Sequence, residues 1–327
     1  MLEPTEVFDT YWRFAAARQA IYLARLAGAA GPWSEDQILR DFRFTNVYRA
    51  ADRVSQFLIQ NVIYAADAPT DSDSVVFRVL LYKIFNRIST WRRLEYALGS
   101  IEWRTYDYAH YARVLDEAAN DGPIYSAAYL MPPPRLGERG KHRNHLRLLE
   151  HMMRDGIART VASPGTLASV YERLVSYPTI GRFLGLQYTI DLNYTPLMVG
   201  SENEFVVAGP GACDGIRKCF GPRSAGIEAE IIEHIVDRQD EYFGRLGLEF
   251  GGLFGRPLHL IDCQNLFCEV DKYSRVAHPN ATGISGRSRI KQRFRPSPDP
   301  LIAVFPPSWE LQGVNSVPDA PPLPPRT

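Results

Sequence analysis

The sequence has few cysteines and no net charge, and both features exclude classes of protein. Its four cysteines show neither Cys-x-x-Cys spacing nor a zinc-type pattern with histidine, which excludes a disulfide framework and a zinc module. They fit reduced core residues of a cytosolic or nuclear protein. The 37 basic and 37 acidic side chains balance, so any nucleic acid would have to bind to a local patch.

Segments that address a protein to a membrane are also missing. No apolar stretch approaches the roughly 18 residues of a membrane span, and the N-terminal sequence lacks the basic and apolar regions of a secretory signal. We therefore expect a soluble protein of the cytoplasm or nucleus with no membrane partner. A length of 327 residues, 45% of them hydrophobic, allows a sizeable core in one large domain or two.

Several catalytic motifs are absent as well. The sequence has no GxxxxGK[ST] phosphate loop, which excludes a P-loop kinase. It has no HExxH or HxE…PCxxC pattern and no GxSxG elbow, so zinc hydrolases, deaminases and serine hydrolases have no support. The seven histidines are scattered, and His259 alone lies near the polar residues discussed below. A single histidine of this kind is typical of a packed or capping residue.

Helical periodicity dominates what is present, so we predict an all-α fold with long connecting loops. The expected helices cover 5–28, 34–41, 46–65, 74–98 (one helix or a pair), 104–119, 145–161, 165–175, 178–190, 228–246 and 261–275. Ser34 with Gln37 forms a capping-box pattern, and Thr45 or Asn46 can cap the helix over 46–65. Short strands remain open near 127–130 and 301–305. The basic, Pro/Gly-rich segment 131–144 is expected to be a loop that could order on a ligand.

The chain changes character near residue 280. We predict a helical domain over 1–278 and a basic, proline-rich tail over 279–327. The tail carries alternating cations that could bind a nucleic-acid backbone or act as a nuclear address: Arg287, Arg289, Lys291, Arg293 and Arg295. A flexible, solubilising tail is the alternative, and the pattern does not separate these interpretations.

The segment 261–275 sorts into two faces of one helix. The apolar face, expected to pack on a core, carries Cys263, Leu266, Phe267, Val270 and Tyr273. The opposite face carries two acids, an amide and an ammonium group, which are Asp262, Glu269, Asn265 and Lys272. Such a stripe supplies the groups of a polar reaction site. The alternative is a solvated face with charge pairs such as Glu269 with Lys272.

The segment 207–218 contains a glycine-rich turn followed by another predicted helix. Gly209 and Gly211 flank a proline, and Arg217 and Lys218 follow in the next turns. The pattern is typical of a helix-hairpin-helix, in which backbone N–H groups at a helix N-terminus bind a DNA phosphate. The alternative is a tight turn that needs glycine for a positive φ.

Cationic residues also gather on two of the predicted helices. Arg43, Arg49 and Arg53 lie on or beside the helix over 46–65, and the next helix carries Arg78, Lys83 and Arg87. Arginine forks suit bidentate binding of a pyrophosphate or a DNA backbone. The alternative is a set of surface arginines whose stems cover apolar side chains.

Five sequence strings, in order along most of the chain, resemble one family. They are FTNVYR at 44–49 with Asp52-Arg53, YKIFN at 82–86, DLNY at 191–194, AGPGA at 208–212, and DCQNLFCE at 262–269 with Lys272-Tyr273. They are similar to the α-glutamyl/putrescinyl thymine pyrophosphorylases, also labelled the helical domain of 5-hydroxymethyl-deoxyuridine DNA kinase. The resemblance implies an all-α core related to the helix-hairpin-helix DNA glycosylases.

The resemblance also implies a reaction on DNA. A 5-hydroxymethyluracil base, already activated as its pyrophosphate ester, would lose pyrophosphate while an amino acid or polyamine attaches to the methylene carbon. Another enzyme would activate the base, because this chain has no phosphate loop. The amine partner and the DNA are the expected substrates. Mg²⁺ is a possible aid to the leaving group, although no dedicated metal cage is visible.

Candidate roles follow from that chemistry. We expect Glu269 to take the proton from the amine, with Asp191 as second choice or as the group that stabilises the developing cation. Candidates for contact with the leaving group are Lys272, Arg49, Arg53, Arg78 and Lys83. Asn46 or Asn265 could read a base edge, and Tyr194 and Tyr273 could stack on a flipped base or belong to the core.

Two other functions fit the same residues. A DNA glycosylase would cleave the N-glycosidic bond of a modified thymine, with an acid such as Asp191 stabilising the sugar cation. A non-catalytic module would bind modified DNA without turning it over. The glycosylase would release free base, the amine-transfer enzyme would release pyrophosphate, and the module would only bind the DNA.

Overall fold

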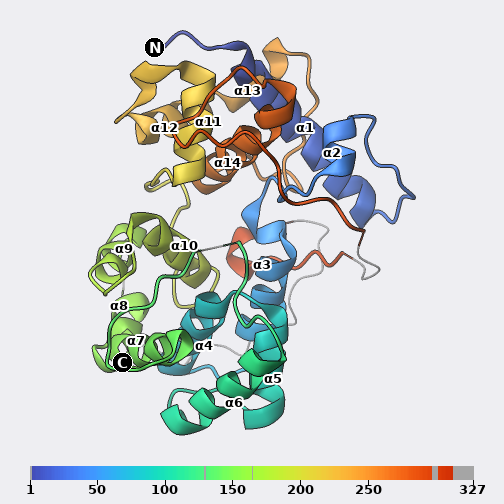
Figure 1. Ribbon diagram of the computed structural model, residues 1–327. Helices are drawn as coiled ribbons and strands as arrows, with labels where there is room; N and C mark the ends of the chain where they lie inside the picture. Colours follow the sequence, from blue (N-terminus) through green and yellow to red (C-terminus); the bar gives the residue numbers. More distant parts are fainter. Residues whose placement is uncertain (1, 129, 164, 297–300, 312–327) are drawn as a thin grey trace. The chain divides into compact units, whose positions relative to one another are not determined.

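The computed structural model describes residues 2–128, 130–163, 165–296 and 301–311 (Figure 1). Regular structure in these residues is helical, and the only β-type pairings among them are the isolated bridges Phe42–Arg293 and Leu253–Arg256. The all-α prediction is confirmed, and no strand forms in the described parts of 127–130 and 301–305. No described helix combines the length and apolar character that a bilayer crossing requires.

The helices divide into two compact units. The first unit contains the residues up to Asp52 and from Glu202 to Ala303, with Leu311. The second unit contains residues from Arg53 to Ser201 and from Val304 to Glu310. Each unit has its own core, as a chain of this length permits.

The first unit is built around one long C-terminal helix. Its helices are α1 (Glu6–Leu26), α2 (Gln37–Asp41), η1 (Arg49–Ala51), α11 (Pro210–Phe220), η3 (Pro222–Ser224), α12 (Glu228–Asp237), α13 (Gln239–Arg245) and α14 (Leu260–Ala277). Thr5 caps α1 by accepting a hydrogen bond from the Val7 N–H group at 3.2 Å. Helix α14 contacts α1, α2, η1, α11 and α12. The predicted apolar face of α14 packs on this core, since Cys263, Phe267 and Val270 are fully buried.

Glycines on α11 allow its backbone to lie directly against α14. A Cβ atom placed on Gly215 would lie 2.1 Å from the Phe267 carbonyl oxygen, and one on Gly211 would lie 3.1 Å from Cys268 Sγ. Because these glycines are one helical turn apart, they form a groove along one face of α11. The glycine-rich sequence at this point therefore serves close helix packing.

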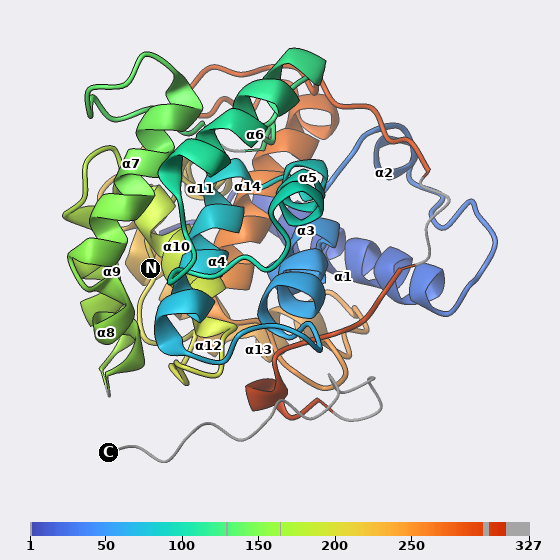
Figure 2. The same ribbon diagram turned by 90° about the horizontal axis from the view of Figure 1, so that it is seen from below.

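The second unit surrounds helix α4. Its helices are α3 (Arg53–Phe57), the π-helix η2 (Leu58–Ile63), α4 (Ser72–Phe85), α5 (Ile88–Leu98), α6 (Tyr108–Asp121), α7 (Lys141–Arg154), α8 (Ile157–Ala162), α9 (Leu167–Val175), α10 (Arg182–Asn193) and η4 (Pro307–Trp309). Every residue of α4 from Ser74 onward is buried. Helix α4 contacts η2, α7, α8 and α10, which enclose it (Figure 2).

The predicted helix over 46–65 is wrong in its first part. The chain forms η1, turns at Asp52, whose ψ of 143° is extended, and only then continues as α3 and η2. Neither Thr45 nor Asn46 caps a helix, because Tyr48 precedes η1 without a side-chain cap. The turn leaves Asn46 free to bind groups from elsewhere in the first unit, as described below.

Other predicted helices begin or divide at points that the periodicity does not mark. Asp36, not Ser34, caps α2, because its carboxylate accepts hydrogen bonds from the N–H groups of Ile38 and Leu39 at 2.7 and 3.3 Å. The segment 74–98 forms two helices, since Asn86 adopts a left-handed conformation with φ 48°. The segment 228–246 likewise divides at Arg238 into α12 and α13.

The first part of the predicted tail packs along the first unit. Ser285 N–H donates to Asp214 Oδ1 at 2.8 Å, and Phe294 N–H donates to the Asp41 carbonyl at 2.9 Å. Arg275 donates to the Arg289 carbonyl at 3.1 Å. The proline-rich end lies outside the described residues, and the division at residue 278 stays a prediction.

The α11–α14 contact predicts a large effect of a single methyl group. Gly215→Ala should lower the free energy of unfolding by about 2 kcal/mol or more, because the methyl group meets backbone that must move. Urea denaturation followed by circular dichroism measures the change. Gly244→Ala on α13 is the matched control, since its Cβ atom would meet nothing within 4 Å, and it should be neutral or stabilise by up to about 1 kcal/mol. Equal stability of the two variants would contradict the close packing.

Candidate functional site

The polar face of α14 lies inside the first unit. Asp262 is 2% exposed and Glu269 is 8% exposed, while Asn265 and Lys272 are half-buried. The solvated alternative is therefore wrong for the two acids. Burial of two carboxylates on one helix requires partners, because an ionised group without them is strongly destabilising.

The C-terminal half of this face holds the loop that precedes η1. Glu269 Oε2 accepts a hydrogen bond from the Thr45 N–H group at 2.9 Å and pairs with Lys272 Nζ at 2.7 Å. The Asn265 side chain donates to the Asn46 carbonyl at 3.0 Å. The structure therefore brings Glu269, Lys272, Asn265 and Asn46 together, with their polar groups engaged in holding the loop.

A second layer of contacts fixes the turn at Asp52. Arg18 Nη2 donates to Asn46 Oδ1 at 2.6 Å, and the Asn46 side-chain amide donates to the Ala51 carbonyl at 2.7 Å. The Asn46 N–H group donates to Asp52 Oδ1 at 2.8 Å. Burial raises the pKa of Asp52 to about 6, and the hydrogen bond from Asn46 and the charge of Arg18 offset only part of that rise.

A carboxylate pair lies at the N-terminal end of the same face. Glu202 Oε2 binds Arg256 Nη2 at 2.7 Å, and Asp262 Oδ2 accepts from the His259 N–H group at 3.1 Å. Burial and the nearby charge of Glu202 together raise the pKa of Asp262 to about 7. Burial also raises the pKa of Glu202 and lowers that of His259 to about 4. Arg49 is 5% exposed and contributes positive charge near Glu202.

The second unit contains a separate buried ion pair. Lys83 Nζ on α4 lies 2.8 Å from Asp191 Oδ2 on α10, and each side chain is 2% exposed. Tyr82 and Tyr188 lie near Asp191. Burial raises the pKa of both hydroxyl groups, and the charge of Asp191 contributes to this rise. The strings YKIFN and DLNY therefore meet at a lysine–aspartate contact removed from water.

The other predicted cations of this unit lie elsewhere. Arg78 is buried and donates to the carbonyl groups of Val62, Ile101 and Asn61 at 2.8, 3.3 and 3.4 Å. Its guanidinium also lies 5.0 Å from the centre of the Trp91 ring. Arg78 thus holds the end of η2 and is not the surface arginine of the alternative, whereas Arg53 at the start of α3 is exposed.

The glycine turn before α11 does not have the form expected of it. Gly209 precedes the helix with φ −75°, so it needs no glycine-specific conformation, and Gly211 faces Cys268. Arg217 is half-buried and donates to the Pro222 carbonyl at 3.3 Å. Lys218 is buried and pairs with Asp271 at 3.0 Å, so its predicted place on a DNA-binding surface is wrong. The helix-hairpin-helix interpretation stays a prediction.

Both tyrosines proposed to stack on a base belong to packed clusters. The Tyr273 hydroxyl donates to Asp36 Oδ2 at 2.6 Å. Its ring packs edge-on against Phe14, with 5.4 Å between the two ring centres. Tyr194 is 1% exposed and packs edge-on against Trp309 at 5.9 Å. The core alternative accounts for both rings.

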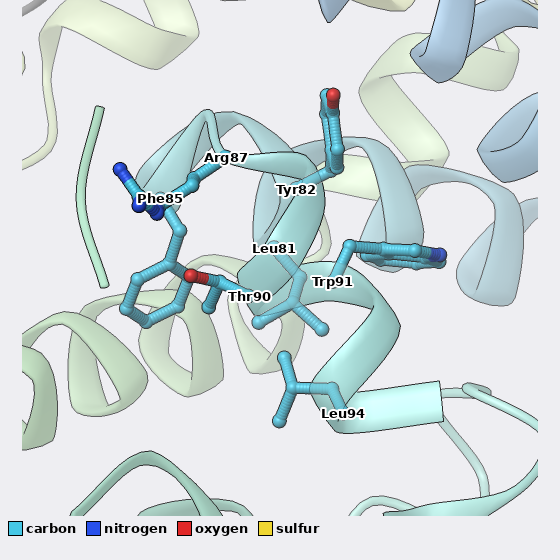
Figure 3. A pocket seen from close by; sticks show the side chains of 7 residues that line it. All are labelled: Leu81, Tyr82, Phe85, Arg87, Thr90, Trp91 and Leu94. Atoms are coloured by element: carbon cyan, nitrogen blue, oxygen red, sulfur yellow. The ribbon is translucent and has the colours of Figure 1, made fainter. Parts of the chain in front are cut away.

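A small pocket lies between α4 and α5 (Figure 3). It is a half-open depression with no room for a water molecule, and it is lined mainly by apolar side chains, with Arg87 and Thr90 as the clearly polar members. The Thr90 hydroxyl already donates to the Ile124 carbonyl at 2.8 Å. The pocket therefore offers little chemistry compared with the buried polar clusters.

Sequence reasoning missed three members of the clusters in the first unit: Arg18, Glu202 and Arg256. Arg18 lies on an alanine-rich helix whose pattern marks no functional position. Glu202 and Arg256 lie in loops, where no periodicity predicts burial. Buried acids on α14 require nearby cations as partners. The sequence does not show that these acids are buried, so it gave no reason to look for such cations.

The raised pKa of Asp52 predicts a pH-dependent stability. Because its folded pKa of about 6 exceeds the unfolded value near 3.9, protonation favours folding, and this contribution is lost as the pH rises from about 4 to 6. Asp52→Asn, which cannot ionise, should therefore gain about 1–2 kcal/mol relative to the native protein between pH 4 and pH 7. Urea denaturation at both pH values measures the gain. A constant difference would show that the pKa of Asp52 is the same in the folded and unfolded protein.

Comparison with known proteins identifies the chain. Residues 5–283 match the family model described as "5-hmdU DNA kinase, helical domain". The chain is similar to the 5-hmdU DNA kinase of Bacillus phage SP10, with 24% identity over 285 residues. That alignment covers 82% of this chain and 45% of the phage protein, so the chain spans about half the length of its relative. No solved structure matches. With most of its length matched, the chain belongs to the family of 5-hmdU DNA kinase helical domains.

Proposed function

We propose that this helical protein modifies 5-hydroxymethyluracil in DNA by replacing the pyrophosphate of the activated base with an amine. The attacking nitrogen forms a bond to the methylene carbon, and the bond from that carbon to the pyrophosphate oxygen breaks. Pyrophosphate leaves with the electron pair, and the proton of the amine passes to a carboxylate. The family match supports action on this base, and the finer reaction rests on the residues below.

The observation that carries the proposal is the meeting of two family-like strings at Lys83 and Asp191. They contribute one ammonium and one carboxylate, 2.8 Å apart and shielded from water. An ammonium can stabilise the charge of departing pyrophosphate, and the adjacent carboxylate can accept the proton of the amine. Both effects are stronger where water is excluded.

This pair is better suited to the reaction than the predicted base Glu269. The Glu269 carboxylate holds the Thr45 N–H group and Lys272, so proton transfer there would disturb the loop before η1. Asp191, which was the second choice, therefore becomes the preferred proton acceptor. Lys83 takes the role of the leaving-group contact, whereas Arg78 is occupied by three carbonyl groups.

A basic loop offers DNA an approach to this part of the second unit. The Ser126 N–H group donates to the Phe85 carbonyl at 2.9 Å, and Phe85 lies two residues after Lys83. The chain then leads into the predicted loop, where Arg135 and Arg139 are exposed, and on to Lys141, an exposed residue at the start of α7. These cations can neutralise backbone phosphates, which position DNA without reading its sequence.

Phosphorylation is the second candidate, because the phage relative is named a kinase. The chain matches only 45% of that protein and contains no phosphate-loop motif. We therefore place the ATP-dependent step outside this chain. An assay with ATP and DNA containing 5-hydroxymethyluracil separates the two candidates.

Nucleoside mass analysis tests the proposed reaction. The protein is incubated with DNA bearing pyrophosphorylated 5-hydroxymethyluracil and a pool of amino acids and polyamines. We expect an amine-adducted nucleoside and one pyrophosphate for each adduct. Abasic sites with free base would instead establish a glycosylase, and bound but unchanged DNA would establish a reader. Phosphate transfer from ATP to the hydroxymethyl group would favour the kinase.

Two matched ion pairs provide the variant test. Asp191→Asn should lower the single-turnover rate of adduct formation by at least about 100-fold, because the proton acceptor is lost. Asp271→Asn is the control, since Asp271 forms an equally buried pair with Lys218 at 3.0 Å. Both variants should lose stability, by about 3–5 kcal/mol if the remaining lysine stays charged. Equal rates in the two variants, measured below their unfolding temperatures, would refute the role of Asp191.

A further inference from the structure

We propose that Glu202, His259 and Asp262 bind a divalent transition-metal ion in the first unit. One donor atom from each residue lies within 4.8 Å of the other two. Two carboxylates and one imidazole form a mixed oxygen–nitrogen set, and three protein ligands leave room for water or a substrate atom. This site is separate in sequence and chemistry from the pair proposed for proton transfer.

Glu202 provides an independent sign of a missing ligand. Its side chain is buried, and Oε2 is bound to Arg256. No group among the described residues donates a hydrogen bond to its second oxygen, Oε1. A buried carboxylate oxygen without a donor is costly, and a metal ion would satisfy it directly.

The imidazole of His259 is prepared for metal binding. Its Nδ1 atom lies 3.1 Å from the Pro257 carbonyl, which can only accept a hydrogen bond. A proton on Nδ1 would satisfy this carbonyl, and the lone pair of Nε2 would then be available to a metal ion. Metal-bound histidines in proteins commonly donate their other N–H group to such a carbonyl.

Asp262 is placed by the start of α14. Its Oδ2 atom accepts from the His259 N–H group, so the helix terminus fixes the distance between these two ligands. The arrangement needs no movement of the helix, because His259 immediately precedes α14 and Asp262 lies in its first turn. Asp262 therefore needs little ordering to bind a metal ion.

Charge at the site is balanced, because the two carboxylates lie near the guanidinium groups of Arg256 and Arg49. Two carboxylates face a neutral imidazole, and Arg256 is engaged with Glu202 through one oxygen only. Arg49 adds positive charge nearby and would limit the affinity. The imidazole favours Mn²⁺, Fe²⁺ or Zn²⁺ over Mg²⁺, which prefers oxygen ligands.

Titration with Mn²⁺, followed by electron paramagnetic resonance, tests the site. We expect the native protein to bind about one ion per chain and Glu202→Gln and Asp262→Asn to weaken binding by at least tenfold. Asp271→Asn is the matched control on the same helix, because its buried carboxylate is already paired with Lys218 and Arg275. It should bind Mn²⁺ as the native protein does.

A second measurement on the native protein keeps the test independent of variant folding. Electron spin-echo modulation of bound Mn²⁺ should show coupling to one imidazole nitrogen, and His259→Gln should abolish that coupling. Absence of the coupling in the native protein, or unchanged Mn²⁺ affinity in Glu202→Gln and Asp262→Asn, would overturn the proposal. The readout is binding alone, so it stands or fails separately from the amine-transfer reaction.

Discussion

Burial of charge on a central helix is the constraint on which each unit depends. Helix α14 in the first unit and α4 in the second are enclosed along most of their length, yet both carry ionisable side chains. Such groups are tolerated inside a protein only when partners compensate for lost hydration. The partners come from distant segments: Lys218 pairs with Asp271 on α14, and Asp191 pairs with Lys83 on α4.

The same constraint explains why the family-like strings are polar. FTNVYR provides the loop that the polar face of α14 holds through Glu269 and Asn265. DLNY provides Asp191 for Lys83, and its Asn193 side chain binds both backbone groups of Gly200 at 2.9 and 3.0 Å. Much of each string is therefore structural. The Lys83–Asp191 pair joins two of these strings and is the candidate for the chemistry proposed above.

The sequence was most informative where a single helical period governs the packing. The apolar face of α14, the long helix α1 and the all-α class follow from spacing and composition. The division of 46–65 did not, because the extended backbone at Asp52 is stabilised by Asn46 and Arg18 rather than by local preference. Lys218 is predicted to add positive charge beside a DNA phosphate, because it follows the glycine turn together with Arg217. Its burial depends on Asp271, 53 residues later.

Photo-crosslinking with DNA tests most directly which buried cluster serves the base. DNA carrying a photoreactive group at the 5-position of uracil is irradiated with the protein, and adducts are mapped by peptide mass analysis. The account predicts adducts on peptides of the second unit that contain residues 82–86 or 191–194. Adducts confined to the first unit, on peptides covering 44–53 or 259–272, would contradict it and assign the base to the face of α14 instead.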